Sequence, residues 1–357
     1  MRLFGREFTR GEIQKRVGDI TQIAGIKPCI LKEGKADGVE AFDIKTGSGL
    51  YFTVLPGRAM DIAWMEHGGL PVGYISKAGI VHSKYYQPFG KEWLRSFYCG
   101  VLTTCGLTHV GPPERDGDEE LGLHGRIANI PAEEVSHLTR WEGDDLVLTV
   151  RGKMREAVLF GENLTLTREI TAYGGESKVI IRDRIENQGY GDTPLMILYH
   201  MNMGFPLVSE DSGIVAPILQ TTARDEEAQK GIENYSRFEA PTPGYLEQVF
   251  FHKVAADADG GTCVGIINES LNFGLYIKYN IKQLPFLTEW KMMGQQDYVL
   301  GLEPGNCTPI GRRAAREKGQ LEVIKAGEVK EVELELGVMT TWEEIQGYKD
   351  YVRKMLK

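Results

Sequence analysis

Glu303 is the residue whose setting best suits acid–base chemistry in this chain. It ends the apolar run Val299-Leu-Gly-Leu and precedes a Pro304-Gly305 turn. A carboxylate in such a place is expected to lose part of its hydration, which raises its pKa and makes it a better base near neutral pH. The alternative is a structural role, in which a glutamate at a strand end accepts hydrogen bonds from nearby backbone N–H groups.

A second candidate is the pair His200 and Asn202, in Leu198-Tyr-His-Met-Asn-Met-Gly. Alternate residues of a strand point to one face, so this spacing places both polar side chains together and the methionines opposite them. The methionine face suits a core. The polar pair then needs hydrogen-bond partners from the protein or from a ligand.

His124 and Arg126 flank Gly125, in Leu123-His-Gly-Arg-Ile-Ala-Asn. A strand there would again place both side chains on one face. The small, polar and glycine-rich residues 102–111 upstream suit the lining of a cavity. Arg126 could bind a carboxylate, sulfonate, phosphate or hydroxyl group of a ligand. The alternative is a histidine whose hydrogen bonds are satisfied within the core or at the surface.

Arg58 and Asp61 follow the apolar residues 50–55 directly, in Pro56-Gly-Arg-Ala-Met-Asp. Charged groups that interrupt a strand pattern are candidates for a functional site. The alternative is a turn that carries a surface ion pair.

Other catalytic chemistries lack their signatures. HxH, HxxxH and HExxH spacings favour a metal site, and the seven histidines show none of them. GxSxG, Walker A and a GxGxxG after a strand are also absent. We therefore predict no metal and no cofactor.

The elements that must position these residues are mainly strands. Hydrophobic residues recur with a period of two in many segments, and no alternation of strands with helices appears, which favours a large antiparallel β sandwich. Thr9 with Glu12 predicts a capping box and a short helix through Val17, and Thr341 with Glu344 predicts a C-terminal amphipathic helix. We predict one domain over residues 1–357, with an N-terminal extension (1–34) carrying the short helix and a C-terminal helix (341–357). The predicted strands cover residues 41–45, 50–55, 146–151, 164–170, 178–185, 274–279 and 329–336.

Composition narrows the class of partner. The chain carries a formal net charge of −9, which argues against nucleic acid or an anionic membrane. Five cysteines without CxxC spacing fit a reducing cytoplasm, and no stretch is apolar enough to span a membrane. We therefore expect a cytoplasmic protein with a small-molecule ligand, either alone or as a homodimer.

Five segments in order resemble the aldose 1-epimerase (galactose mutarotase-like) superfamily, and within it the DUF4432 branch. Each motif is weak alone, but together they cover roughly residues 35–340. The motifs are Pro56-Gly-Arg-Ala-Met-Asp-Ile, Leu102-Thr-Thr-Cys-Gly-Leu, Leu123-His-Gly-Arg-Ile-Ala-Asn, Tyr199-His-Met-Asn-Met-Gly and Gly301-Leu-Glu-Pro-Gly-Asn-Cys.

The resemblance implies a β-supersandwich whose concave face binds a sugar and interconverts its anomers. It implies that Glu303 is the general base and His200 the general acid, with His124 and an upstream arginine, Arg58 or Arg126, contacting the sugar. This chain departs from the superfamily pattern, which has His-Pro-Tyr-Phe-Asn where this sequence has His200-Met-Asn-Met-Gly. The aspartate that contributes to substrate binding in the superfamily has no clear match, and Glu289, Trp290 and Lys291 lie in about that region. The implied sugar-binding residues are Arg58, Asp61, His124, Arg126, Asn202, Trp290, Lys291 and Asn306.

Anomer exchange would need Glu303 ionised and His200 protonated, facing each other across one groove with room for a pyranose between them. Trp64, Trp290 or Tyr199 could stack on the apolar face of the sugar. Two alternatives stay open: an isomerase of a modified or phosphorylated sugar acting at another carbon, and a sugar-binding protein without turnover. A glycoside hydrolase or lyase is less favoured, because hydrolysis generally uses two carboxylates.

Overall fold

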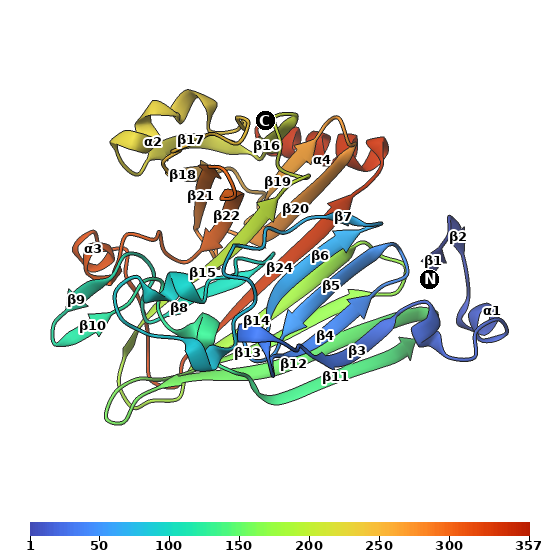
Figure 1. Ribbon diagram of the computed structural model, residues 1–357, viewed down its shortest axis with the longest axis horizontal. Coiled ribbons are helices and arrows are strands. Elements are labelled where there is room, and N and C mark those ends of the chain that lie inside the picture. Colours follow the sequence, from blue (N-terminus) through green and yellow to red (C-terminus); the bar gives the residue numbers. More distant parts are fainter.

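Antiparallel strands form most of the regular secondary structure in the computed structural model, which describes residues 1–357 (Figure 1). The pairings between the named strands are all antiparallel. The largest sheet has eight strands, in the order β11 (Glu133–Glu142), β12 (Asp145–Ala157), β13 (Asn163–Tyr173), β14 (Lys178–Asn187), β24 (Val329–Met339), β20 (Phe273–Asn280), β19 (Gly261–Asn268) and β16 (Ser212–Val215).

The second sheet carries the candidate catalytic residues. Its order is β17 (Ile218–Ala223), β18 (Gln248–Val254), β21 (Phe286–Met293), β22 (Tyr298–Gly305), β15 (Thr193–Gly204) and β23 (Glu322–Ile324), and β8 (Thr103–Leu107) also pairs with β15.

A third sheet and several short elements complete the chain. The third sheet runs β3 (Gly25–Ile30), β4 (Glu40–Lys45), β5 (Leu50–Leu55), β6 (Asp61–His67) and β7 (Leu70–Pro71). Two small hairpins pair β1 (Arg2–Leu3) with β2 (Arg6–Glu7) and β9 (Glu114–Asp116) with β10 (Glu119–Leu121). The α-helices are α1 (Arg10–Gln14), α2 (Glu226–Lys230), α3 (Arg312–Glu317) and α4 (Trp342–Met355), and 3-10 turns cover Ile20–Gln22, Gly34–Ala36, Ser83–Tyr85, Glu92–Arg95, Ile127–Asn129 and Ile232–Asn234.

The three sheets share one apolar core. A cluster of 55 buried residues includes Phe52 from the third sheet, Leu334 and Ile277 from the eight-stranded sheet, and Met201 and Leu302 from the second sheet. Strands such as β14 alternate buried and less buried residues, as expected for a sheet with one face on a core. The antiparallel β sandwich predicted from the sequence is therefore confirmed.

The chain between β7 and β11 covers the face of the second sheet that points away from this core, which we call its outer face. A separate cluster of buried residues joins the two, with Trp93 and Phe97 from the covering segment and Met196 and Leu198 from β15. Because β15 is covered on both of its faces, nearly every one of its residues is buried.

A buried guanidinium connects all three sheets beneath β15. Arg168 of β13 donates to both carboxylate oxygens of Asp183 on β14, at 2.9 and 2.6 Å, and to Asp61 on β6 at 2.7 Å. It also donates to Thr104 on β8 at 2.8 Å, and the Tyr199 hydroxyl of β15 donates to Asp183 at 2.7 Å. Burial alone would lower the pKa of Arg168, but the two carboxylates outweigh it and raise that pKa above its usual value. The positive charge is therefore retained in the core.

The helices near the two ends of the chain mostly agree with those predicted from the sequence. Both capping boxes are present, although α1 ends at Gln14 rather than at Val17. Ile345, Tyr348 and Val352 of α4 are buried as the periodicity predicts, whereas Trp342 is 63% exposed. All five cysteines are free thiols. None of the helices is both long and apolar enough to cross a membrane.

We predict that Arg168→Gln lowers the free energy of unfolding by about 3–5 kcal/mol, because it leaves two buried carboxylates without their charged partner. Urea unfolding measured by circular dichroism would check this. The matched control is Arg182→Gln on β14. The Arg182–Glu333 pair is half-exposed, so this change should cost under about 1 kcal/mol. Equal losses in the two variants would contradict the role given to the buried network.

Candidate functional site

A cleft of about 450 Å³ lies on the outer face of the second sheet. Strand register assembles its floor: Glu303 on β22 lies opposite Thr288 on β21, and the Met201–Leu302 pairing brings His200 of β15 beside Glu303. The segment that covers the sheet and the loops at its edge supply the walls. Other lining residues are Trp93, Phe97, His124, Arg224, Glu247 and Trp290.

Glu303 and His200 touch at the floor of the cleft. His200 Nε2 lies 3.2 Å from Glu303 Oε1, and the two side chains are only 6% and 2% exposed. The contact is not aligned as a hydrogen bond, since Glu303 Oε1 has no hydrogen-bond partner. Gly301 makes the contact possible, because a Cβ at that position would lie 2.5 Å from this oxygen and 3.4 Å from His200 Cε1.

Burial disfavours charge on both groups. It raises the pKa of Glu303 well above its usual value, with a smaller increase from the nearby Glu247 carboxylate and a decrease from Arg224. It lowers the pKa of His200 to about 4, partly opposed by the side chain of Asn202. Burial in the cleft therefore favours a neutral carboxylic acid beside a neutral imidazole. This is the opposite of the charge state expected from the sequence.

Unpartnered polar atoms converge on this cleft. Twelve buried side-chain nitrogen or oxygen atoms have no hydrogen-bond partner, and five of them belong to residues that line it. Buried polar groups are nearly always hydrogen-bonded, so such a concentration indicates a place that a polar ligand or water completes. The five atoms are Trp93 Nε1, His124 Nδ1, His200 Nδ1, Thr288 Oγ1 and Glu303 Oε1.

Aromatic rings surround His200. The ring of His200 lies 5.3 Å from that of Phe97, 5.3 Å from that of Trp290 and 5.9 Å from that of His124, all nearly edge-to-face. Trp93 in turn packs 5.1 Å from His124. Burial lowers the pKa of His124 well below its usual value, so this imidazole is also neutral. The result is an apolar cage with a few polar atoms directed into it, as small-molecule sites commonly have.

Asn202 supports His200 rather than the cleft. Its side chain is fully buried, and its Nδ2 donates to the carbonyl of His200 at 2.9 Å and to that of Gly100 at 3.0 Å. The predicted common face with His200 is correct, but the predicted contact with a substrate is corrected to a positioning role.

Arg58 and Asp61 also have structural roles. Arg58 is 1% exposed and donates to the carbonyls of Val81, Ser96 and Ala128, which tie the covering segment to the third sheet. Asp61 is fully buried and belongs to the Arg168 network. Neither side chain reaches the cleft, so the prediction that they contact a substrate is corrected.

Lys291 and Asn306 face away from the cleft as well. Lys291 follows Trp290 on β21 and therefore points to the opposite face, where it is fully buried and lies 2.9 Å from Glu239. Asn306 accepts from the backbone N–H of Ile197 at 2.7 Å and so joins the end of β22 to β15. Both predictions of substrate contact are corrected.

His124 and Arg126 are separated by a turn rather than joined by a strand. His124 and Gly125 adopt φ angles of +56° and +75°, and a Cβ on Gly125 would lie 2.3 Å from the Gly106 carbonyl oxygen. The turn directs His124 into the cleft. Arg126 lies beside Glu119 at 3.4 Å, in a different cavity lined also by Asn129. The predicted shared face of His124 and Arg126 is therefore wrong.

Sequence reasoning missed several residues of the cleft. Trp93 and Phe97 lie in a covering segment without strand periodicity, and Arg224 and Glu247 stand at the two ends of a long excursion between β17 and β18. Arginine and glutamate are also common in ordinary surface loops, so Arg224 and Glu247 did not stand out in the sequence. Only the tertiary fold brings them to one cleft with Glu303, His200, His124 and Trp290.

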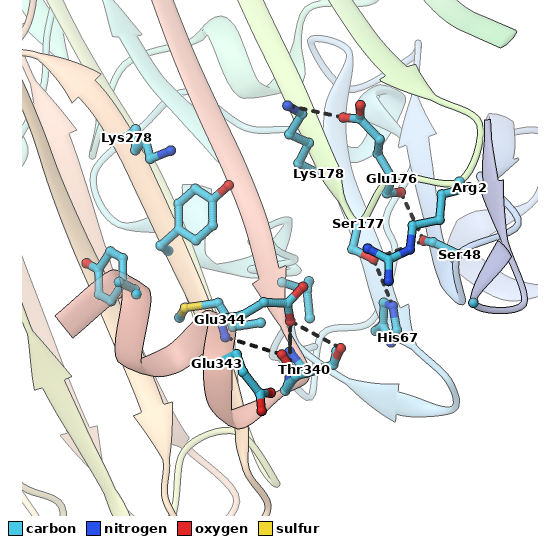
Figure 2. Close-up of a pocket in the computed structure, with 18 of the residues that line it drawn as sticks. Arg2, Ser48, His67, Glu176, Ser177, Lys178, Lys278, Thr340, Glu343 and Glu344 are labelled. Atoms are coloured by element: carbon cyan, nitrogen blue, oxygen red, sulfur yellow. Dashed lines mark hydrogen bonds and ion pairs between the residues drawn. The ribbon is translucent and has the colours of Figure 1, made fainter. Parts of the chain in front are cut away.

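A larger cavity, of about 1050 Å³, shares no lining residue with this cleft, and Figure 2 shows residues that line it. None of the twelve buried atoms without a partner belongs to its lining. Several of its polar groups pair with one another: Lys178 lies 3.1 Å from Glu176, and His67 Nε2 lies 3.0 Å from the Ser177 hydroxyl. Glu344 caps α4 by accepting from the backbone of Thr341 at 3.1 Å. We therefore place the functional site in the smaller cleft, where buried polar atoms lack partners.

Comparisons with known proteins give a family and a fold. The model of the family described as "Domain of unknown function (DUF4432)" matches residues 36–338. No curated protein matches the chain.

Solved structures confirm the predicted galactose mutarotase-like sandwich. A proposed aldose 1-epimerase from Klebsiella pneumoniae is 23% identical, with a TM-score of 0.88 over 93% of this chain and 88% of that one. A galactose mutarotase-like protein from Clostridium acetobutylicum is 14% identical, with a TM-score of 0.61 over 90% and 100% of the two chains. The galactose 1-epimerase of Lactobacillus acidophilus is 12% identical, with a TM-score of 0.58 over 89% and 99%.

We predict that Glu303→Gln stabilises the protein at pH 7, because the raised pKa of Glu303 makes ionisation of this carboxyl unfavourable in the folded protein. The folded protein holds the Glu303 proton above pH 4.5, where the unfolded chain releases it, so the wild type loses stability as pH rises through that window. Glutamine does not titrate, and its advantage should therefore shrink as pH falls towards 4.5. Urea unfolding between pH 4.5 and 7.5 measures this. A variant less stable than wild type at pH 7 would contradict the neutral acid.

Proposed function

Because the chain belongs to the DUF4432 family, a domain of unknown function, we propose a function from the cleft itself: it binds a sugar, and Glu303 and His200 interconvert the sugar's anomers. The observation that carries this proposal is the contact of a buried carboxyl with a buried imidazole, 3.2 Å apart, on the floor of an aromatic cleft. Fold similarity to mutarotases supports the proposal, but a fold can host many functions.

The reaction is general acid–base catalysis. One group removes the proton from the anomeric hydroxyl while the other protonates the ring oxygen, and the bond between C1 and that oxygen breaks. The open-chain aldehyde turns about its C1–C2 bond, and the same two groups act in reverse to close the ring. Atoms and protons balance without a further reactant.

The geometry of the pair suits two oxygens on one carbon. The anomeric hydroxyl and the ring oxygen are both bonded to C1, so adjacent catalytic atoms can reach both from the same side. A pyranose does not fit between atoms 3.2 Å apart. The sugar is therefore proposed to lie over the pair, against the Trp290 ring, rather than between the two side chains as the sequence suggested.

Glu303 and His200 together hold one transferable proton in either charge distribution. A neutral acid beside a neutral imidazole differs from a carboxylate beside an imidazolium only by transfer of that proton, so no exchange with solvent is required. Sugar hydroxyls would donate to Glu303 Oε1, which has no hydrogen-bond partner within the protein. Hydrogen bonds to a carboxylate favour its charged form. Binding is thus proposed to convert Glu303 into the base and His200 into the acid.

We predict that Glu303→Gln and His200→Asn each reduce anomer exchange by about 10²–10⁴, the usual contribution of one acid–base group. Exchange NMR over a panel of pyranoses measures the rates, and calorimetry checks that sugar binding survives. Glu289→Gln is the matched control, because Glu289 lies 2.8 Å from His252 on the other face of β21 and is equally buried. It should leave exchange unchanged.

Unchanged exchange in Glu303→Gln would overturn the proposed mechanism. Conversion of a pyranose into a different sugar, rather than into its other anomer, would instead favour an isomerase acting at another carbon. Sugar binding without any exchange in the wild type would favour a binding protein.

A further inference from the structure

Trp290 owes its orientation to a residue from a distant loop. Its indole Nε1–H donates to Glu247 Oε2 at 2.9 Å. The ring itself lies in the cleft, 5.3 Å from the ring of His200 and 6.4 Å from that of Phe97. A hydrogen bond to a carboxylate is stronger than one to a neutral acceptor, so it can hold the ring in one rotamer.

Glu247 is itself held in place. Arg224 NH2 donates to its Oε1 at 3.1 Å, and the Arg224 backbone N–H donates to the Val249 carbonyl at 2.9 Å. Arg224 and Glu247 are the first and last residues of the segment 224–247 that joins β17 to β18, which we call the excursion. Their ion pair closes the base of that excursion at the rim of the cleft.

The same excursion is fixed to the opposite face of β21. Lys291, the neighbour of Trp290, donates to the Asn234 carbonyl at 3.2 Å and lies 2.9 Å from Glu239. The backbone N–H of Thr242 donates to the Met293 carbonyl at 2.8 Å. Adjacent residues of one strand thus bind the excursion from both faces. Glu247 is therefore presented to Trp290 from a fixed position.

We propose that Glu247 is a positioning residue that holds the Trp290 ring as the stacking platform for the sugar, an inference that rests on the proposed function. An indole free to rotate would have to be ordered when the sugar binds, and this ordering would weaken affinity. A ring fixed beforehand avoids that loss. Glu247 acts here through Trp290 and is not assigned a part in proton transfer.

A double-mutant cycle tests the coupling, with sugar affinity measured by calorimetry. Glu247→Ala should weaken binding about tenfold, the effect of losing one charge-assisted hydrogen bond. In a Trp290→Phe background, which has no indole N–H, Glu247→Ala should have almost no further effect. Glu247→Gln keeps an acceptor oxygen and should retain affinity within about threefold. Equal losses from Glu247→Ala in both backgrounds would overturn the proposal.

The pH–rate profile reports the charges at the rim of the cleft, separately from the orientation of Trp290. The Glu247 carboxylate raises the pKa of Glu303 and Arg224 lowers it, beside the larger effect of burial. Glu247→Gln should therefore shift the profile to lower pH and Arg224→Gln to higher pH. Shifts in the same direction would contradict the electrostatic arrangement at the rim.

A spectroscopic signature separates this inference from the proposed function. The near-ultraviolet circular dichroism of Trp290, obtained as wild type minus Trp290→Phe, should be lost in Glu247→Ala and kept in Glu247→Gln. The control Glu226→Ala, at an exposed position of α2 in the same excursion, should leave it unchanged. A protein without sugar binding or anomer exchange would refute the function, whereas an unchanged Trp290 signal in Glu247→Ala would refute the positioning role alone.

Discussion

The arrangement of the cleft depends on a guanidinium buried where three sheets meet. Arg168 binds Asp183 and Asp61, and Asp183 in turn binds the Tyr199 hydroxyl. Tyr199 points into the core, and its neighbour His200 points into the cleft. A network satisfied on all sides rigidifies the strand that carries it. The position of the candidate acid is thus set from beneath, by charges that never meet a ligand.

The cleft shows the converse arrangement, with polar atoms left without partners. The contact between Glu303 and His200 is shielded by aromatic rings, and burial removes the charge from both groups. Such a site costs stability, as functional sites commonly do. It becomes favourable when a ligand supplies the missing hydrogen bonds, which is the condition for binding a polyhydroxylated molecule in an apolar cage.

Local patterns predicted the β architecture of the fold, and they singled out the two central residues of the candidate site. Period-two alternation identified seven of the strands, and strand spacing correctly placed His200 and Asn202 on one face. Sequence could not show that Arg58 and Asp61 are buried, because partners such as Arg168 and the Val81 carbonyl are brought to them only by tertiary packing. The turn at Gly125 and the cleft position of Glu247 likewise depend on contacts between segments distant in the chain.

¹⁵N NMR of the His200 imidazole tests most directly whether Glu303 and His200 are both neutral in the protein without a ligand. The resonance is assigned by its absence in His200→Asn and followed from pH 8 to pH 4. We predict a neutral His200 ring at pH 7 that titrates with a pKa of about 4. A His200 ring that is already charged at pH 7, or that titrates near the ordinary value of about 6.5, would contradict it.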